Sequence, residues 1–185
     1  MTTPEELFTQ AEVDDAIDEL AAAIDGIRDT KRLVFLAVLE GGRWLSDRLA
    51  GHPVLSGKSI HQRAVKASRT VEDGVLGDVV ISPAFGRDLL PELTSRDVVL
   101  IDDIFDEGRT LEALTALVSP VANRVRSVVL VRRIRPDTQK AARLPDFTGL
   151  ETQNQGWLVG CGMDSSGRMR NLPYVGIVNT DKTQS

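Results

Sequence analysis

The sequence predicts an α/β fold in which a parallel sheet is flanked by helices. Three aliphatic runs, at 33–39 (LVFLAVL), 98–105 (VVLIDDIF) and 125–134 (VRSVVLVRRI), have the composition of strands buried on both faces. Segments with helical spacing lie between them, and the connections are short. Such strand–helix–strand units form right-handed crossovers between parallel strands, and ligands bind beyond the carboxyl ends of those strands.

The helices are predicted from apolar periodicity and from glycines at their ends. Apolar residues recur every three or four positions from Val13 to Ile24, so we expect an amphipathic helix over 11–28. Gly41 and Gly42 turn the chain into a short helix at 43–51, which ends at a glycine. Apolar positions over 111–121 predict a helix directly after the strand at 98–105.

Two segments are less regular. Residues 60–82 alternate weakly around a polar, glycine-containing loop, which predicts a hairpin-like excursion with a mobile tip. Residues 143–173 are rich in glycine, proline and polar side chains and predict short strands and loops, followed by a strand at 174–178. No linker divides the chain, so we expect one domain over 1–185, with a small hood lobe mainly from 143–173 and the N-terminal segment.

Composition narrows the class of protein. The net charge of −5 argues against a nonspecific nucleic-acid binder, and no apolar run approaches the length of a membrane span. The polar, acidic start and the single cysteine, Cys161, favour a cytoplasmic location. With two histidines, His52 and His61, a Cys/His zinc site is not expected, so a metal would be a hard ion on carboxylates. We assign no role to the histidines and expect Cys161 and Trp44 to pack in the core.

The stretch 98–110 (VVLIDDIFDEGRT) carries the chemistry. Asp102 and Asp103 lie where a buried strand ends, and Gly108 to Thr110 lead into a helix. A helix N-terminus offers free N–H groups to an anion, and carboxylates suit sugar hydroxyls, so the stretch fits a sugar phosphate. A Walker loop and a dinucleotide-binding fingerprint are absent, and a receiver domain carries its acidic pair earlier in the chain. A capping role for the two aspartates is the remaining alternative.

The same stretch resembles the phosphoribosyl pyrophosphate (PRPP) signature of type I phosphoribosyltransferases. LVFLAVLEGG (33–42) is similar to the family's pyrophosphate-loop strand, and KASRTVEDGVLGD (66–78) is similar to its mobile catalytic loop. The stretch from Pro145 to Val178 resembles the C-terminal part of hypoxanthine-guanine phosphoribosyltransferases, which points to 6-oxopurines. The resemblance covers roughly residues 10–180. It implies transfer of the phosphoribosyl group of PRPP to a purine, with Mg²⁺, in a homodimer or homotetramer.

The resemblance also implies roles for individual residues. Asp102 and Asp103 would bind the ribose hydroxyls, and Asp106 would face purine N7 as general base or its assistant. The 5′-phosphate would be wrapped by Asp106, Glu107, Gly108, Arg109 and Thr110. Pyrophosphate would meet Glu40, Gly41, Ser68, Arg69 and Arg170. The purine would meet Arg132, Trp157, Leu158 and Asp164. Asp164 would hold Mg²⁺, with Asp102 and Asp103 as further candidate ligands.

Four positions depart from the usual family pattern. Glu40 stands where a lysine often precedes the glycines, and Arg69 replaces a tyrosine. Arg132 replaces a lysine that contacts the 6-oxo group, an exchange that changes both length and geometry. Glu107 replaces a threonine, so we expect its side chain to point away from the phosphate while its N–H donates. A non-proline cis peptide is expected within 39–41.

Three functions are compatible with these features. The first is purine salvage with hypoxanthine, guanine or both as acceptor. The second is a non-catalytic regulator of the same fold that senses PRPP or nucleotides, although the basic face that nucleic-acid binding would require is not evident. The third is a transferase of the same fold with another acceptor such as xanthine, for which Arg132 is the main motive.

Overall fold

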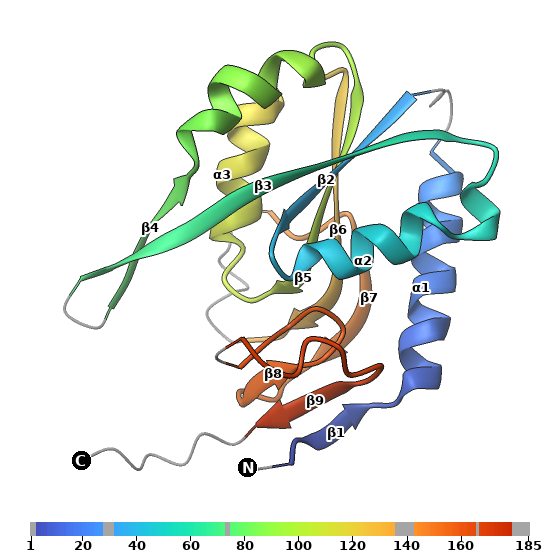
Figure 1. Cartoon of the computed structure of the whole chain (residues 1–185), viewed down its shortest axis with the longest axis vertical. Coiled ribbons are helices and arrows are strands. Elements are labelled where there is room, and N and C mark those ends of the chain that lie inside the picture. Colours follow the sequence, from blue (N-terminus) through green and yellow to red (C-terminus); the bar gives the residue numbers. More distant parts are fainter. Residues whose placement is uncertain (1–2, 28–31, 73–74, 136–142, 166, 179–185) are drawn as a thin grey trace.

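A computed structural model describes residues 3–27, 32–72, 75–135, 143–165 and 167–178. Its main sheet has six strands in the order β4-β3-β2-β5-β6-β7, parallel except for β4. The strands are β2 (Arg32–Leu39), β3 (Ser59–Glu72), β4 (Val75–Ile81), β5 (Asp97–Phe105), β6 (Arg124–Arg133) and β7 (Phe147–Thr152). The predicted parallel sheet is therefore confirmed (Figure 1).

Helices cover both faces of this sheet. Alternate residues of β2 divide between two cores: Leu33 and Phe35 pack in one, Val34 and Leu36 in the other. The first core includes α1 (Gln10–Asp25) and α2 (Gly42–Ala50). The second includes α3 (Arg109–Val118) and the short turns η2 (Phe85–Leu89) and η3 (Leu90–Leu93). Each large apolar side chain so buried contributes about 1.5–3 kcal/mol, which fixes the sheet that carries the site.

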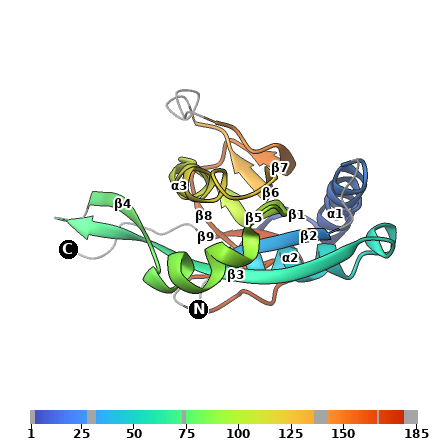
Figure 2. The ribbon, with the colours of Figure 1, turned by 90° about the horizontal axis from the view of Figure 1, so that it is seen from above.

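The β3–β4 hairpin extends beyond the body of the sheet (Figure 2). Ser59 to Lys66 of β3 pair in parallel with the whole of β2, and Ala67 to Glu72 pair with β4. The predicted excursion is thus half right: its first part is a sheet strand and its second part is the hairpin. Before β3, a 3₁₀ turn η1 (Pro53–Leu55) follows α2.

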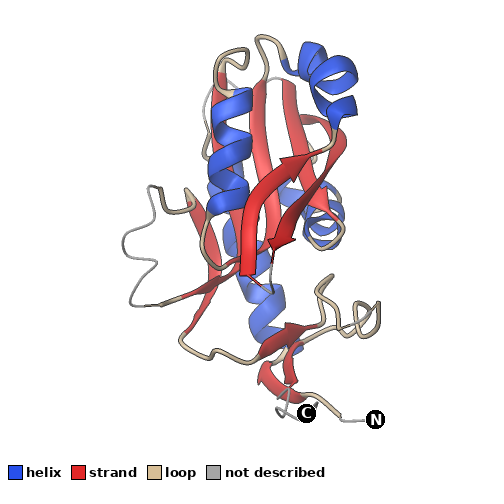
Figure 3. Ribbon diagram, turned by 90° about the vertical axis from the view of Figure 1, so that its left-hand side faces the viewer, coloured by secondary structure: helices blue, strands red, loops and turns tan. Residues whose placement is uncertain are grey.

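A small antiparallel sheet forms the lobe, with the order β1-β9-β8 (Figure 3). Its strands are β1 (Glu5–Phe8), β8 (Trp157–Val159) and β9 (Val175–Val178). The N-terminal segment contributes to it as expected. Of the segment 143–173 that we expected to form most of the lobe, residues 147–152 instead pair with β6 as the edge strand of the main sheet. Within the described ranges, no helix combines the length and apolarity needed to cross a bilayer.

Candidate active site

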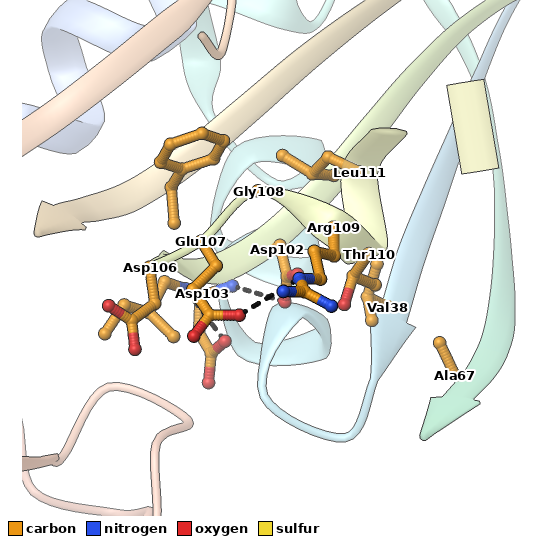
Figure 4. A pocket seen from close by; sticks show the side chains of 12 residues that line it. Val38, Ala67, Asp102, Asp103, Asp106, Glu107, Gly108, Arg109, Thr110 and Leu111 are labelled. Carbon is orange, nitrogen blue, oxygen red and sulfur yellow. Dashed lines mark hydrogen bonds and ion pairs between the residues drawn. The ribbon is translucent and has the colours of Figure 1, made fainter. Parts of the chain in front are cut away.

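The carboxyl end of β5 opens into a cavity of about 230 Å³ (Figure 4). Its wall is almost continuous in sequence, because β5 ends and α3 begins within a few residues. The lining consists of Asp102 through Leu111, together with Val38 and Ala67. All the residues expected to hold ribose and 5′-phosphate therefore line one cavity.

Asp102 and Asp103 are adjacent carboxylates at this strand end. The N–H of Asp103 donates to Asp102 Oδ1 at 3.0 Å, and the N–H of Ile104 donates to Asp103 Oδ1 at 2.8 Å. Burial, and after it repulsion by Asp103, raises the pKa of Asp102 well above its usual range. Burial also raises the pKa of Asp103, against the opposing effect of hydrogen bonds and the Arg170 charge. This accumulation of negative charge favours polyhydroxyl or cationic ligands.

The loop between β2 and α2 lies directly against these carboxylates. The Leu39–Glu40 peptide bond is cis, as predicted. A Cβ on Gly41 would lie 1.7 Å from Asp103 Oδ2, and one on Gly42 would lie 2.4 Å from the Ile101 carbonyl oxygen. The two glycines are therefore required by close approach to β5, which brings the predicted pyrophosphate loop to the predicted ribose site.

Gly108 shapes the turn from β5 into α3. Its φ of +78° suits glycine, and a Cβ there would lie 2.6 Å from the Phe105 ring. The following helix begins at Arg109, so the loop presents a helix N-terminus to the cavity. We expected the Glu107 side chain to point away from the phosphate, but Glu107 lines the cavity. Its Oε2 lies 3.3 Å from Arg109 Nε (Figure 4), which places a cation beside the charge that would repel a phosphate.

A second cavity of about 180 Å³ lies between β5, β6 and the lobe. It is lined by Asp103, Ile104, Asp106, Arg133, Trp157, Leu158, Met163 and Asp164. The Trp157 side chain is 56% exposed although it is aromatic, and its Nε1 donates to the Asp164 carbonyl oxygen at 2.6 Å. An indole fixed by its edge and open on its face suits a flat ring. Trp157, Leu158, Asp106 and Asp164 are thus brought together as predicted.

The adjacent arginines of β6 face opposite ways. Arg132 Nη2 lies 2.7 Å from Glu151 Oε1 of β7, and Arg132 is not part of either cavity wall. Arg133 lines the second cavity, donates to the Gly156 carbonyl oxygen at 2.8 Å, and lies 3.5 Å from Asp106 Oδ2. Burial lowers the pKa of Arg133. Arg133, and not Arg132, therefore lines the cavity that we expect to hold the purine, because successive side chains of a strand point to opposite faces.

Arg135 is a further residue that the sequence did not single out. Its Nε lies 2.7 Å from Asp106 Oδ1, and its Nη2 donates to Asp106 Oδ2 at 3.0 Å. Arg133 also lies beside Asp106. Asp106 and Asp103 are the two carboxylates that line both cavities. The signal available in the sequence was the density of arginine in RRIR, which does not say which of them faces inward.

Arg170 joins the lobe to the loop before α2. Its Nη1 donates to the Gly162 carbonyl oxygen at 2.6 Å, and its Nη2 lies 2.8 Å from Asp164 Oδ1 and 3.2 Å from Glu40 Oε2. Asp164 also accepts from the Gly167 N–H. Two predicted residues, Glu40 and Asp164, therefore meet at the guanidinium of a third.

The predicted catalytic loop is placed less fully. Ser68 lies exposed on β3, opposite Val80 of β4, and its neighbour Ala67 lines the first cavity. The backbone of Arg69 pairs with Val79, but its side chain lies outside the described part of the molecule. The structure thus brings the start of this loop to the site.

The residues present fit a Mg²⁺ ion that is held jointly by carboxylates and by substrate oxygens. Among the described residues, no group of three or more His, Cys, Asp or Glu side chains converges as a metal site. Mg²⁺ is typically held by one or two carboxylates and by substrate oxygens, so it does not need such a group. Asp102 and Asp103 supply suitable hard oxygens, whereas Asp164 is already paired with Arg170.

Comparison with known proteins agrees with this geometry. The phosphoribosyl transferase domain family matches residues 5–166. The chain is 38% identical over 96 residues to the bifunctional protein TilS/HprT of Listeria innocua, a match that spans 51% of this chain and only 14% of that protein. It is 31% identical over 156 residues to the hypoxanthine-guanine phosphoribosyltransferase of Bos taurus, covering 80% of this chain and 68% of that protein.

A solved structure supports the same conclusion. The hypoxanthine phosphoribosyltransferase of Staphylococcus aureus superposes with a TM-score of 0.80 at 25% identity, over 95% of this chain and 91% of that one. The family match covers far more than half of the chain, and the superposition covers almost all of it. This chain belongs to the phosphoribosyl transferase domain family.

Proposed function

We propose that the protein is a purine-salvage phosphoribosyltransferase, which transfers the 5-phosphoribosyl group of PRPP to N9 of a 6-oxopurine, hypoxanthine or guanine or both. The observation that carries the proposal is that the two cavities share Asp103, Ile104 and Asp106. A sugar phosphate in the first and a flat base in the second would meet at that shared wall. Their reacting atoms would then be adjacent, which is the main requirement of a two-substrate transfer.

In the proposed reaction, the N9 lone pair forms a bond to ribose C1′ while the C1′–oxygen bond to pyrophosphate breaks. The electron pair of that bond leaves with pyrophosphate. Positive charge grows on the sugar, where the Asp102 and Asp103 carboxylates would stabilise it. Asp106 would face N7 and accept, or help to remove, the proton that the base loses. The Arg170 guanidinium would offset charge that grows on the leaving group.

Mg²⁺ is the cofactor that this proposal requires, and its role would be to neutralise pyrophosphate oxygens. Asp164, with Asp102 and Asp103 as further candidates, would hold it together with substrate oxygens. The experiment that tests the proposed function is a panel of purines, incubated with PRPP and Mg²⁺ and followed by nucleotide formation. We expect IMP from hypoxanthine, GMP from guanine, or both. No nucleotide from hypoxanthine, guanine or xanthine would overturn the proposal.

Xanthine is a second candidate acceptor, favoured by Arg133 and Arg135 beside Asp106. Two guanidinium groups at one cavity wall suit a base with an additional oxygen acceptor. A xanthine rate above those for hypoxanthine and guanine would select this alternative. The non-catalytic regulator is separated by the same panel, because it would bind PRPP or nucleotide without turnover.

Assembly and location complete the proposal. A homodimer or homotetramer is proposed from the family resemblance, and light scattering on the purified protein would give its mass directly. A cytoplasmic location is proposed from the single cysteine. Fractionation of cells that express the native protein would test it.

A further inference from the structure

Arg170 is a shared cation between two carboxylates from different parts of the fold. Its Nη2 lies 2.8 Å from Asp164 Oδ1 in the lobe and 3.2 Å from Glu40 Oε2 in the loop before α2. The two carboxylates are held differently. Asp164 also accepts the Gly167 N–H, whereas Arg170 is the side chain with which Glu40 pairs in the described part of the chain. Glu40 is therefore the more easily displaced partner.

Glu40 lies in the loop that the proposed function assigns to the leaving pyrophosphate. It precedes Gly41, whose missing Cβ leaves room for the Asp103 carboxylate. A Cβ on Gly162 would lie 2.4 Å from the Gly41 carbonyl oxygen, so the lobe rests on the same loop. The Glu40 side chain is 72% exposed, so its carboxylate fills no packing role. Glu40 therefore acts on the site through its ion pair with Arg170.

The local charges do not balance. Glu40 and Asp164 both pair with one guanidinium. Burial raises the pKa of Asp103, and the Arg170 charge opposes that rise, which places the charge near the ribose site. An incoming pyrophosphate group would need the same cation. The pyrophosphate group would have to displace the Glu40 carboxylate from Arg170. The displaced carboxylate would then lie close to the negative charge of the pyrophosphate.

We propose that Glu40 sets the affinity of the site for pyrophosphate and for the pyrophosphate group of PRPP by competing with them for Arg170. The proposal deepens the proposed function and rests on it, because it assumes that pyrophosphate is the leaving group. In this account Glu40 is an affinity-determining residue. It weakens donor binding and speeds release of the product pyrophosphate.

Two substitutions at Glu40 separate competition from simple repulsion. Glu40→Gln removes the charge and keeps the length. Glu40→Asp keeps the charge but shortens the side chain by about 1.5 Å, which withdraws the carboxylate from Arg170. If competition for Arg170 is the cause, both variants bind magnesium pyrophosphate more tightly than the wild type. We expect a gain of roughly two- to fivefold, the range that one exposed ion pair supports.

The measurement is calorimetric titration of the full chain with magnesium pyrophosphate and, separately, with PRPP and Mg²⁺. The KM for PRPP should fall by the same factor, and the KM for the purine should not change. Asp14→Asn is the matched control, because it removes a comparably exposed ion pair with Arg48, 2.7 Å long, between α1 and α2. That variant should bind pyrophosphate as the wild type does.

Unchanged or weaker binding in Glu40→Gln would overturn the proposal. So would wild-type affinity in Glu40→Asp beside tighter binding in Glu40→Gln, because charge alone would then explain the effect. The purine panel keeps this test separate from the proposed function. A wild type that binds pyrophosphate in a Glu40-dependent way but makes no nucleotide would refute the transferase and leave the competition standing.

Discussion

The Arg135 guanidinium contacts both oxygens of the Asp106 carboxylate, with Nε 2.7 Å from Oδ1 and Nη2 3.0 Å from Oδ2. The Asp106 carboxylate is thereby held in one orientation at the wall that the two cavities share. A carboxylate in a fixed orientation is a better partner for a base proton than one that rotates freely.

Asp106→Asn should therefore lower kcat by roughly 10²–10⁴-fold, the range that a positioned general base supplies. The comparison variant is Cys161→Ser, whose thiol is buried and donates to the Leu172 carbonyl oxygen at 3.7 Å. Burial raises the pKa of Cys161 to about 12, so the thiol stays protonated and takes no part in the chemistry. Equal losses in the two variants, measured by steady-state kinetics on folded protein, would discredit the role of Asp106.

The two arginines at the end of β6 should behave differently. Arg133→Gln should lower kcat/KM for the purine by roughly 10–100-fold, as expected for a lost hydrogen bond to a charged donor. Arg132→Gln should lower it by less than about threefold, because Arg132 pairs with Glu151 and lines neither cavity. A larger loss in Arg132→Gln than in Arg133→Gln would reverse our assignment.

Gly41→Ala should inactivate the protein without unfolding it. The added Cβ would meet Asp103 Oδ2 at 1.7 Å and displace that carboxylate, and a misplacement of about 1 Å can cost roughly 10²-fold in rate. Gly57→Ala is the control, since no atom lies within 4 Å of its Cβ position. Turnover and thermal melting of both variants test the prediction, which fails if Gly41→Ala retains wild-type kcat/KM.

Trp157 should report on the purine. Trp157→Ala should raise the KM for the base by roughly 5–100-fold, the value of one stacked base, while Trp157→Phe keeps much of the stacking. The exposed indole should also change its fluorescence when a base binds, and the remaining Trp44 should not. A purine-dependent signal that survives in Trp157→Phe would contradict the stacking role.

The buried acidic pair should make stability depend on pH. The folded-state pKa of Asp102 is raised, so the folded protein binds its proton more tightly than the unfolded chain does. Stability is then lost as pH rises from the unfolded pKa, about 3.9, through the folded value. Asp102→Asn should raise Tm by a few degrees at pH 8 and by less at pH 5. A Tm difference that is equal at both values would contradict this account.

Much of the main sheet could be read from the sequence because its strands are buried on both faces. Residues 33–39 and 98–101 are continuous apolar runs, a pattern with few competing interpretations. The edge strand β7 was not predicted, because its sequence lacks such an apolar run. FTGLET (147–152) alternates weakly and contains a glycine, and its Gly149 is required by contact with the Leu130 carbonyl oxygen, which the sequence does not reveal.

The site was predictable where its residues are consecutive and less so where they are paired across the fold. Residues 102–110 line one cavity because a strand end and a helix start fix them together. Whether Arg132 or Arg133 lines the cavity depends on which face of β6 packs against the lobe, and only the tertiary structure shows this. The Glu40–Arg170 pair joins residues far apart in sequence, and Gly162 packs on Gly41 where the two segments meet.

The pairing of β1 with β9 has a consequence for how the chain matures during translation. Glu5 lies opposite Ile177, so the small sheet needs both an early and a late segment of the polypeptide. Strands β2 to β7 all leave the ribosome before β9 does, because synthesis runs from the N-terminus. All the residues that line the first cavity are therefore synthesised before the small sheet can be completed. A stalled chain that lacks β9 would carry these lining residues without a complete small sheet.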